Sequence, residues 1–300
     1  MDSEERKKQQ LEQMQHGHGF IAALDQSGGS TPKALQNYGI GPDKYSGDDE
    51  MFALVHQMRT RVITSPVFTS NKILGAILFE RTMNSPIDGK LTAEYLWEDK
   101  HIVPFLKIDD GLADRADGVQ LMKPIPELAD RLAAANQHEV FGTKERSVIY
   151  TNNLAGIQAI VDQQFDLART VCAAGLVPII EPEVSIRAVD KARIESHLHE
   201  CIKKKLETWN ENDKIMFKFS IPDVPNIYHD LYSYPAVVRV VALSGGYTMD
   251  EACARLAQNE NMPASFSRAL LQNLRAGQTD EQFNAALGAA IEQIYQASIN

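Results

Sequence analysis

The sequence predicts an α/β fold, specifically a (β/α)8 TIM barrel with a closed parallel sheet inside and helices outside. Three observations support this. Eight short apolar segments recur through the 300 residues, segments of helical periodicity lie between them, and no Pro/Gly/Ser-rich linker divides the chain. Near-continuous apolar strands that alternate with amphipathic helices are typical of parallel sheets. Eight such units in about 250 residues favour a closed barrel over an open sheet.

The expected strands are the apolar segments themselves. They are "GFIAALD" (19–25), "KILGAILF" (72–79), "VPFLKID" (103–109), "VFGTKERSVI" (140–149), "LVPIIEPE" (176–183), "IMFKFSIP" (215–222), "VVRVVALSG" (237–245) and "PASFSRAL" (263–270). The second is marked only by its apolarity, and the last has the weakest strand character. An open doubly wound sheet is the alternative, but no strand is followed by Gly-x-Gly-x-x-Gly or a Walker-type loop.

Apolar residues at helical spacing predict the outer helices. They lie at 51–62, 154–168, 194–209 and 283–294. Thr248-x-x-Glu251 has the pattern of a capping box and predicts a further helix start. We therefore expect one barrel domain over residues 1–300, with a helical N-terminal extension (about 1–17) and a C-terminal helix (about 279–298).

Composition excludes several classes of partner. A net charge of −10 and a pI of about 5.3 oppose general binding to nucleic acid or to anionic membranes. No run of about 18 apolar residues predicts a membrane span. The charged N-terminus "MDSEERKKQQLEQMQ" lacks the apolar part of a signal peptide. Three widely spaced cysteines fit a reduced cytoplasmic protein better than a disulfide framework.

Charged residues stand two apart near the C-terminal ends of several expected strands. Residues i and i+2 of a strand face the same way, and barrel active sites lie where the C-terminal strand ends meet. The sequence places five cations and four anions there: Lys107, Lys144, Arg146, Lys218, Arg268, Asp25, Asp109, Glu181 and Glu183. A single pair is better interpreted as a solvated strand end. Nine charges together must be mutually paired or must bind something.

Lys218 lies in the middle of the apolar segment "IMFKFSIP" (215–222). An ordinary lysine in such a place lays its stem on apolar surface and extends its ammonium group into water. Alternatively, burial and the nearby cations Lys144 and Arg146 would lower its pKa towards the ~7–8 of a catalytic lysine. A neutral amine is a nucleophile that condenses with a carbonyl to form a Schiff base. The clustered charges favour this second interpretation.

Two Ser/Gly loops have the composition of phosphate sites. Ser244-Gly245-Gly246 ends the seventh expected strand before a helix, and "DQSGGSTPK" (25–33) follows the first. Glycines let backbone N–H groups approach a phosphate, and a helix N-terminus favours an anion. Ser-Gly-Gly alone is weak evidence, but phosphates commonly bind after strands seven and eight of such barrels. Arg268 would add a charge-assisted contact there. Two phosphate pockets beside a reactive lysine indicate a bisphosphorylated sugar.

The order and spacing of seven segments resemble class I fructose-1,6-bisphosphate aldolases, most closely the shorter bacterial branch. These segments are "GFIAALDQSGGSTPKAL", "VPFLKIDDGL", "FGTKERS", "GLVPIIEPEV", "MFKFSIP", "VVRVVALSGG" and "ASFSRAL". The resemblance runs from about residue 18 to 298. It implies a lyase of glycolysis and gluconeogenesis that cleaves fructose 1,6-bisphosphate reversibly to dihydroxyacetone phosphate and glyceraldehyde 3-phosphate. The reaction would proceed through a lysine Schiff base, with no cofactor and no metal.

The resemblance also implies residue roles. Lys218 matches the Schiff-base lysine, and Glu181 matches the carboxylate that shuttles protons while the iminium forms. Asp25 matches the residue that helps remove the C4 hydroxyl proton, and Lys144 matches a lysine that supports the carbinolamine and cleavage steps. The implied substrate contacts are Ser244, Gly245, Gly246 and Arg268 on the dihydroxyacetone side, Ser27, Ser30 and Lys107 on the aldehyde-phosphate side, and Arg146 and Glu183 in the surrounding ion pairs.

The chain departs from the pattern of the family at four places. Gln26 stands where the animal enzymes carry an acidic residue, and Ala34 where they carry an arginine. Asp110 stands where many members have a lysine. We expect these three changes to tune affinity. The animal enzymes end in a mobile tail whose terminal tyrosine exchanges a proton with the enamine. This chain ends "IYQASIN", with Tyr295 expected inside the last helix, so the sequence does not identify the enamine's proton donor.

No metal site is expected, because the histidines do not cluster. His197 and His199 are two apart on an expected helix, so their side chains point about 200° apart. His16 and His18 precede the first strand. All four are expected at the surface.

Other functions remain open at the level of sequence. A Schiff-base aldolase or transaldolase for tagatose or sedoheptulose bisphosphate is one, since C4 stereochemistry cannot be read from residues. A scaffold protein on an inactive barrel is another, but it predicts a decayed site, whereas every central residue is present. The expected partner is a small sugar bisphosphate. A homo-oligomer is compatible with the sequence, which leaves oligomeric state, substrate breadth and physiological direction open.

Overall fold

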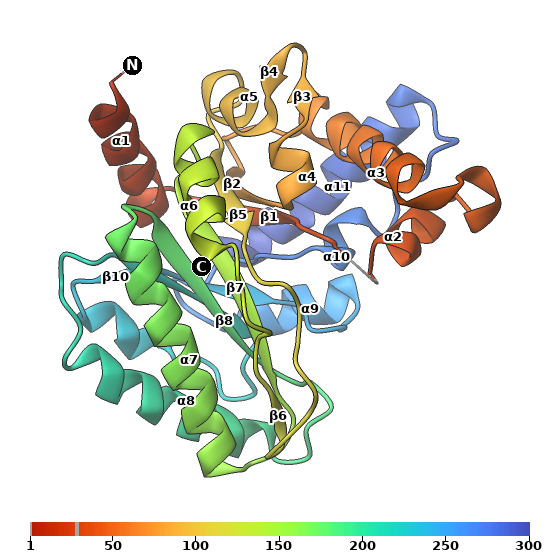
Figure 1. Ribbon diagram of the computed structural model, residues 1–300. Helices are drawn as coiled ribbons and strands as arrows, with labels where there is room; N and C mark the ends of the chain where they lie inside the picture. The colour runs from red at the N-terminus through yellow and green to blue at the C-terminus, as the bar shows by residue number, and fades with distance from the viewer. Residues whose placement is uncertain (1, 28–29) are drawn as a thin grey trace.

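The centre of the molecule is a parallel sheet of seven strands that curls around a common interior (Figure 1). The computed structural model describes residues 2–27 and 30–300. The strands follow one another in chain order: β1 (Phe20–Leu24), β2 (Ile73–Leu78), β5 (Val103–Lys107), β7 (Gly142–Ile149), β8 (Val177–Val184), β9 (Ile215–Ser220) and β10 (Val237–Leu243). The first seven predicted strands are confirmed, each within two residues of its expected bounds.

The eighth predicted strand, 263–270, is wrong as a regular strand. The segment does lie between the two outer strands: Ile21 N–H in β1 donates to Ala264 O at 2.9 Å, and Ser265 N–H donates to a carbonyl of β10 at 2.7 Å. Only Ala264 forms a ladder bridge. Pairing stops early because helix α10 (Arg268–Leu271) begins where the strand was expected to continue. The eighth position is therefore filled by an irregular segment.

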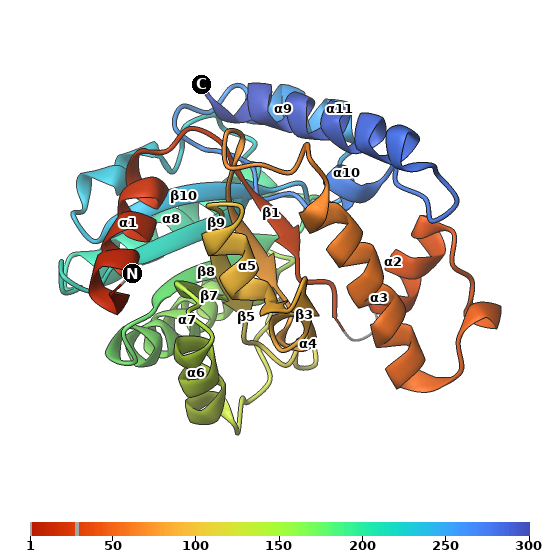
Figure 2. The same cartoon turned by 90° about the horizontal axis from the view of Figure 1, so that it is seen from above.

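Helices pack on the outside of the sheet, as the apolar periodicity predicted. Figure 2 shows α9 and α11 on one side and α6 and α7 on the opposite side. Besides α10, the helices are α1 (Ser3–His16), α2 (Thr31–Tyr38), α3 (Gly47–Thr64), α4 (Glu80–Met83), α5 (Thr92–Glu98), α6 (Leu128–Gln137), α7 (Leu154–Ala173), α8 (Lys191–Leu206), α9 (Met249–Leu256) and α11 (Asp280–Ser298).

One helix boundary differs from expectation. Trp209, which was expected on α8, lies beyond the end of that helix at Leu206. Its ring packs edge-on against Phe165 of α7, with the two ring centroids 5.3 Å apart. Trp209 therefore makes its apolar contact from the connection that follows α8, and not from the helix itself. Within the described part of the chain, none of the helices combines the length and the apolarity needed to cross a membrane.

The N-terminal end of the sheet interior is closed by α1. Met14 of α1 is buried in one cluster with interior residues of several strands, among them Ile21, Phe105 and Met216. Arg239 of β10 donates to the carbonyl of Met14 at 2.7 Å and to that of Gly17 at 2.9 Å, which holds the end of the helix in place. Apolar packing fills this end, so the polar strand residues collect at the opposite, C-terminal end.

Short elements complete the C-terminal end. After β5 the chain returns as β6 (Val119–Gln120), which pairs antiparallel with the last residues of β7. A small hairpin of β3 (Pro86–Ile87) and β4 (Lys90–Leu91) precedes α5. Two short 3-10 helices lie at Pro42–Lys44 and His229–Ser233.

Candidate active site

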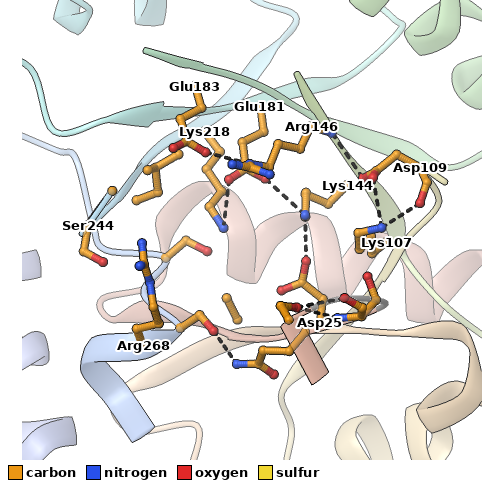
Figure 3. Close-up of a pocket in the computed structure, with 18 of the residues that line it drawn as sticks. Asp25, Lys107, Asp109, Lys144, Arg146, Glu181, Glu183, Lys218, Ser244 and Arg268 are labelled. Carbon is orange, nitrogen blue, oxygen red and sulfur yellow. Dashed lines mark hydrogen bonds and ion pairs between the residues drawn. The ribbon is translucent and has the colours of Figure 1, made fainter. Parts of the chain in front are cut away.

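A cavity of about 470 Å³ lies at the C-terminal ends of the strands (Figure 3). Of the site residues predicted from sequence, all but Gly246 line it. They are Asp25, Ser27, Ser30, Lys107, Lys144, Arg146, Glu181, Glu183, Lys218, Ser244, Gly245 and Arg268. They come from β1, β5, β7, β8, β9, β10 and the segments that follow them. The parallel sheet brings together residues up to 243 positions apart because all its C-terminal ends share one edge.

Lys144 lies at the centre of the buried charges. Its Nζ is 2.6 Å from Asp25 Oδ2 and 3.1 Å from Glu181 Oε2; the side chains of Lys144 and Glu181 are buried, and that of Asp25 is 11% exposed. In β7, Lys144 pairs in register with Ile179 of β8, two residues before Glu181. The strand stagger therefore lets the lysine stem reach up between the two carboxylates. This ion pair joins the first strand to the fourth and fifth positions of the barrel.

Lys218 approaches the same cluster from β9. It is 4% exposed, and its Nζ lies 3.6 Å from Glu181 Oε1. Its neighbours Phe217 and Phe219 face the other way into the apolar layer under the helices, as strand alternation requires. Figure 3 shows the amine directed into the cavity. The sequence puzzle of a lysine inside an apolar strand thus has a structural answer: the amine is enclosed beside one carboxylate.

The lysines keep Asp25 ionised. Burial alone would raise the pKa of Asp25, but the positive charges of Lys144, Lys218 and Lys107 outweigh it and hold that pKa well below its usual range. Burial likewise opposes the charge on Lys144, but Asp25 and Glu181 raise its pKa above the ordinary lysine value. Asp25 is therefore a permanently charged acceptor at neutral pH, held by a permanently charged lysine.

Two further ion pairs surround this centre. Lys107 Nζ is 2.9 Å from Asp109 Oδ1, and Arg146 Nε is 2.6 Å from Glu183 Oε2. Burial opposes the charge of Arg146, but Glu183 raises its pKa above the usual value. The cations expected to repel the Lys218 ammonium are thus themselves paired with carboxylates.

The loop after β1 is a turn at the cavity wall. Ser30 Oγ donates to Ser27 O at 2.8 Å and accepts from Ser27 N–H at 3.1 Å. Gly28 and Gly29 of the expected phosphate loop lie outside the described residues. Lys33, the last residue of this expected loop, lines an adjoining cavity of about 630 Å³ and not the main cavity.

The loop after β10 needs its first glycine for two reasons. Gly245 has φ 61°, and a Cβ there would lie 2.6 Å from Ile186 Cγ2. Gly246 lines the adjoining cavity rather than the main one, because the chain has turned away towards α9. Arg268 lines both cavities and, among the described residues, forms no ion pair. Of the cations that line the main cavity, it is the one that has no carboxylate partner within the described residues.

Several lining residues were not predicted. Gln26, Ser265, Ser267 and Leu112 also line the cavity. Ser265 is 1% exposed, and its hydroxyl has no hydrogen-bond partner among the described residues. The spacing of Ser265 and Ser267 in "ASFS" could have indicated both residues, because residues two apart in an extended segment share a face. Leu112 comes from an irregular connection and has no such signal.

The histidine prediction is wrong for His199. His199 is 9% exposed, and its Nε2 lies 2.5 Å from Asp230 Oδ1, because α8 turns this position towards the His229–Ser233 turn. His16 and His18 are exposed as expected, and His197 is partly buried. Among residues 2–27 and 30–300, no group of three or more His, Cys, Asp or Glu side chains has the arrangement of a metal site.

Comparison with known proteins agrees with this geometry. The family model "Glycolytic: Fructose-bisphosphate aldolase class-I" matches residues 6–209. A solved fructose-bisphosphate aldolase from Plasmodium falciparum, in complex with TRAP and a small-molecule inhibitor, is 20% identical with a TM-score of 0.73, covering 99% of this chain and 94% of that one. An archaeal fructose 1,6-bisphosphate aldolase is 12% identical with a TM-score of 0.50, covering 97% and 99%. Since the family model spans more than half of the residues, the chain belongs to the class I fructose-bisphosphate aldolase family.

Proposed function

We propose that the protein cleaves fructose 1,6-bisphosphate reversibly to dihydroxyacetone phosphate and glyceraldehyde 3-phosphate, through a Schiff base on Lys218. The observation that carries the proposal is the enclosed Lys218 amine 3.6 Å from Glu181, beside the Asp25–Lys144 pair. An amine next to a carboxylate, and a second carboxylate held ionised, are the groups that iminium formation and retro-aldol cleavage require.

Schiff-base formation uses Lys218 and Glu181. The Lys218 ammonium gives one proton to the Glu181 carboxylate, and the resulting neutral amine attacks C2 of the open-chain ketose and forms a carbinolamine. Glu181, in its acid form, gives a proton to the departing hydroxyl, which leaves as water, and the nitrogen lone pair forms the protonated iminium. Glu181 lies within ion-pair distance of both Lys218 and Lys144, so a proton taken from the attacking amine has a short path to the leaving hydroxyl.

Cleavage uses Asp25. Its carboxylate accepts the C4 hydroxyl proton, the C4–O bond becomes the aldehyde carbonyl, and the C3–C4 bond breaks. The electron pair of that bond moves into the iminium, which becomes an enamine, and glyceraldehyde 3-phosphate leaves. Protonation at C3 and hydrolysis of the iminium then release dihydroxyacetone phosphate. Lys144 holds Asp25 ionised and turned towards the cavity. The lowered pKa of Asp25 and the 2.6 Å distance between Lys144 Nζ and Asp25 Oδ2 support this role.

The phosphates would lie on opposite walls. Arg268, which pairs with no carboxylate in the part of the chain that the structure describes, and the Ser244–Gly245 turn suit the phosphate of the dihydroxyacetone part. The Ser27–Ser30 turn and Lys107 suit the other phosphate. A net charge of −10 gives no long-range attraction for such a substrate, so these local groups must supply it.

Borohydride trapping tests the proposal. The enzyme is incubated with fructose 1,6-bisphosphate or dihydroxyacetone phosphate, reduced with borohydride with and without EDTA, and mapped by mass spectrometry. We expect an adduct of dihydroxyacetone phosphate mass on Lys218 that EDTA does not affect. Lys218→Met, which removes the amine, should give neither adduct nor cleavage, whereas Lys204→Met on the exposed face of α8 should retain both.

Other outcomes would point elsewhere. Cleavage that EDTA abolishes, with no adduct on Lys218, would mean a metal-dependent site and would contradict the residue roles. An adduct and cleavage with tagatose or sedoheptulose bisphosphate, but not with the fructose compound, would keep the mechanism and change the substrate. No adduct and no cleavage with any of these sugars would favour a binding or scaffold role.

A further inference from the structure

Arg59 of α3 is a buried cation that the proposed mechanism does not use. It is 1% exposed, yet none of the ion pairs within the described residues includes it. A guanidinium removed from water without a carboxylate partner is costly. Burial accordingly lowers the pKa of Arg59 to about 10, while the negative charge of nearby Asp25 opposes that shift. Arg59 therefore stays charged at neutral pH, and the active-site carboxylate is the negative charge that stabilises it.

Arg59 donates hydrogen bonds both to a second helix and to Gln26, the residue that follows Asp25. Its Nη1 donates to Thr82 Oγ1 of α4 at 2.6 Å. Its Nη2 donates to the backbone carbonyl of Gln26, and more weakly to Gln26 Oε1 at 3.4 Å. The two nitrogens thus form a fork between a helix outside the sheet and the backbone of the β1 loop, where no regular ladder remains to fix the chain, because β1 ends at Leu24.

Gln26 carries the connection across the cavity mouth. Its Nε2 donates to Ser267 Oγ, immediately before Arg268. A neutral side chain here can donate through its amide to Ser267 and accept from Arg59, whereas a carboxylate could only accept. The loop after β1 is therefore held through Gln26, which bonds to Ser267 on one side and to Arg59 on the other.

We propose that Arg59 is a positioning residue that fixes the backbone after Asp25 and so holds the Asp25 carboxylate in the orientation that accepts the C4 hydroxyl proton. This rests on the proposed function. The carbonyl carbon of Gln26 and the Cα of Asp25 are only four backbone bonds apart, so a rotation of the backbone at Gln26 moves the Asp25 carboxyl group away from Lys144. Misplacing a reacting group by about 1 Å costs up to ~100-fold in rate.

The proposal predicts that loss of Arg59 slows cleavage of fructose 1,6-bisphosphate but does not affect Schiff-base formation with dihydroxyacetone phosphate. Fructose 1,6-bisphosphate has a C4 hydroxyl and needs Asp25 for cleavage. Dihydroxyacetone phosphate has no C4, so its Schiff base on Lys218 does not require the Asp25 orientation. Arg59→Met should lower kcat for cleavage by ~10–100-fold, while borohydride trapping of dihydroxyacetone phosphate on Lys218 proceeds as in the wild type. A general loss of structure would lower both together.

Two more variants should lower the cleavage rate by smaller amounts. Arg59→Lys keeps a charge but presents a single ammonium that cannot span Thr82 and Gln26 as the fork does, so its cleavage rate should fall between the wild type and Arg59→Met. Thr82→Val removes only the Nη1 acceptor and should give a smaller loss of cleavage, with trapping again unaffected. The matched control is Arg81→Met, the neighbouring arginine, which is exposed, pairs with Asp49 and should cleave as the wild type does.

The wild type is measured first. If it traps no dihydroxyacetone phosphate on Lys218, the proposed function fails, whatever the variants do. If it traps and cleaves, then cleavage at the wild-type rate in both Arg59 variants overturns the positioning role. Loss of trapping and cleavage in equal proportion overturns it too. Should Arg59→Met fail to fold, Arg59→Lys and Thr82→Val decide by the same two readouts.

Discussion

At the scale of single residues, the site works by pairing each buried charge with a partner of defined geometry. Lys144 holds two carboxylates, Arg146 holds Glu183, and Lys107 holds Asp109. A single unpaired charge at this depth would be costly. The network keeps Asp25 charged. The Lys218 amine lies beside Glu181 and faces the open space of the cavity.

Removing Lys144 should move the pH profile as well as the rate. Because Lys144 is the strongest of the charges that lower the pKa of Asp25, Lys144→Met raises that pKa. Asp25 then loses its proton only at higher pH, so the acid limb of the kcat/KM profile for cleavage should move to higher pH. We also expect kcat at neutral pH to fall by ~100-fold or more. Lys204→Met is the control, and an unmoved acid limb would contradict the assignment.

Glu145 offers a prediction about stability. It points away from the cavity, is fully buried, and accepts one hydrogen bond from Thr143 at 3.1 Å, while its Oε1 has no partner among residues 2–27 and 30–300. Burial raises its pKa well above the usual value. Above about pH 4.3 the unfolded chain releases this proton while the folded chain keeps it, so stability falls as pH rises, by ~1.4 kcal/mol per pH unit up to the folded pKa.

Glu145→Gln removes that titration. Relative to the wild type, the variant should therefore gain in free energy of unfolding between pH 4 and pH 7, as measured by urea unfolding at both values. Glu200→Gln, at an exposed position of α8, should show no such gain. A difference between variant and wild type that stays constant from pH 4 to pH 7 would mean that Glu145 is ionised in the folded protein.

At the scale of elements, caps and turns decide where the site residues stand. Thr248 Oγ1 accepts from Glu251 N–H, as the capping-box pattern predicted, and so begins α9 soon after the Ser244 turn. The reciprocal box with both hydrogen bonds is found at α11, between Thr279 and Gln282. These caps fix the starts of both helices, and the turn before α9 brings Ser244 and Gly245 to the cavity.

Gly245→Ala tests the turn after β10. The new methyl group would meet Ile186 Cγ2 at 2.6 Å in a left-handed backbone conformation, and such strain costs ~1–3 kcal/mol. We expect KM for fructose 1,6-bisphosphate to rise by about tenfold, because the turn and its N–H groups shift. Gly89→Ala has the same kind of backbone, with φ 82°, but open space around the new methyl group. Steady-state kinetics of both variants separate the two causes, and equal KM values would contradict the role of the turn.

At the scale of the whole molecule, the helices at the two ends of the chain cover different parts of the fold. The helix α1 covers the N-terminal end of the sheet interior, and α11 supports the segment that takes the eighth position. Ser298 Oγ accepts from Ala264 N–H at 3.0 Å and donates to Ile294 O at 2.7 Å. The last helix therefore satisfies a backbone group that an eighth regular strand would have paired. The single-domain organisation, a homo-oligomer and a cytoplasmic location stay predictions.

Ser298→Ala tests this support. The variant leaves the buried Ala264 N–H without an acceptor, which costs ~1–3 kcal/mol, and the melting temperature should fall by several degrees. Ser196→Ala, an exposed serine on α8, is the control and should melt as the wild type does. Thermal unfolding followed by circular dichroism measures both, and equal melting temperatures would show that another group satisfies Ala264.

The sequence by itself determined the order of the strands and the types of residue at their ends. Period-two and period-3.6 patterns are local, so seven strands and the main helices could be located without coordinates. The i, i+2 spacing of Lys144 with Arg146, and of Glu181 with Glu183, is local too, and it correctly indicated which side chains share a face.

Only the tertiary structure decided which charges are partners and how the sheet ends. The contacts of Lys144 with Asp25 and Glu181 depend on strand stagger, which no single strand encodes. The irregular segment at 263–266 depends on hydrogen bonds to two other strands and to α11. Arg59 gave no sequence signal because its partners lie on other elements, Thr82 on α4 and Gln26 in the loop after β1. Such contacts join distant parts of the chain, and their free energy is decided only when all the parts are packed together.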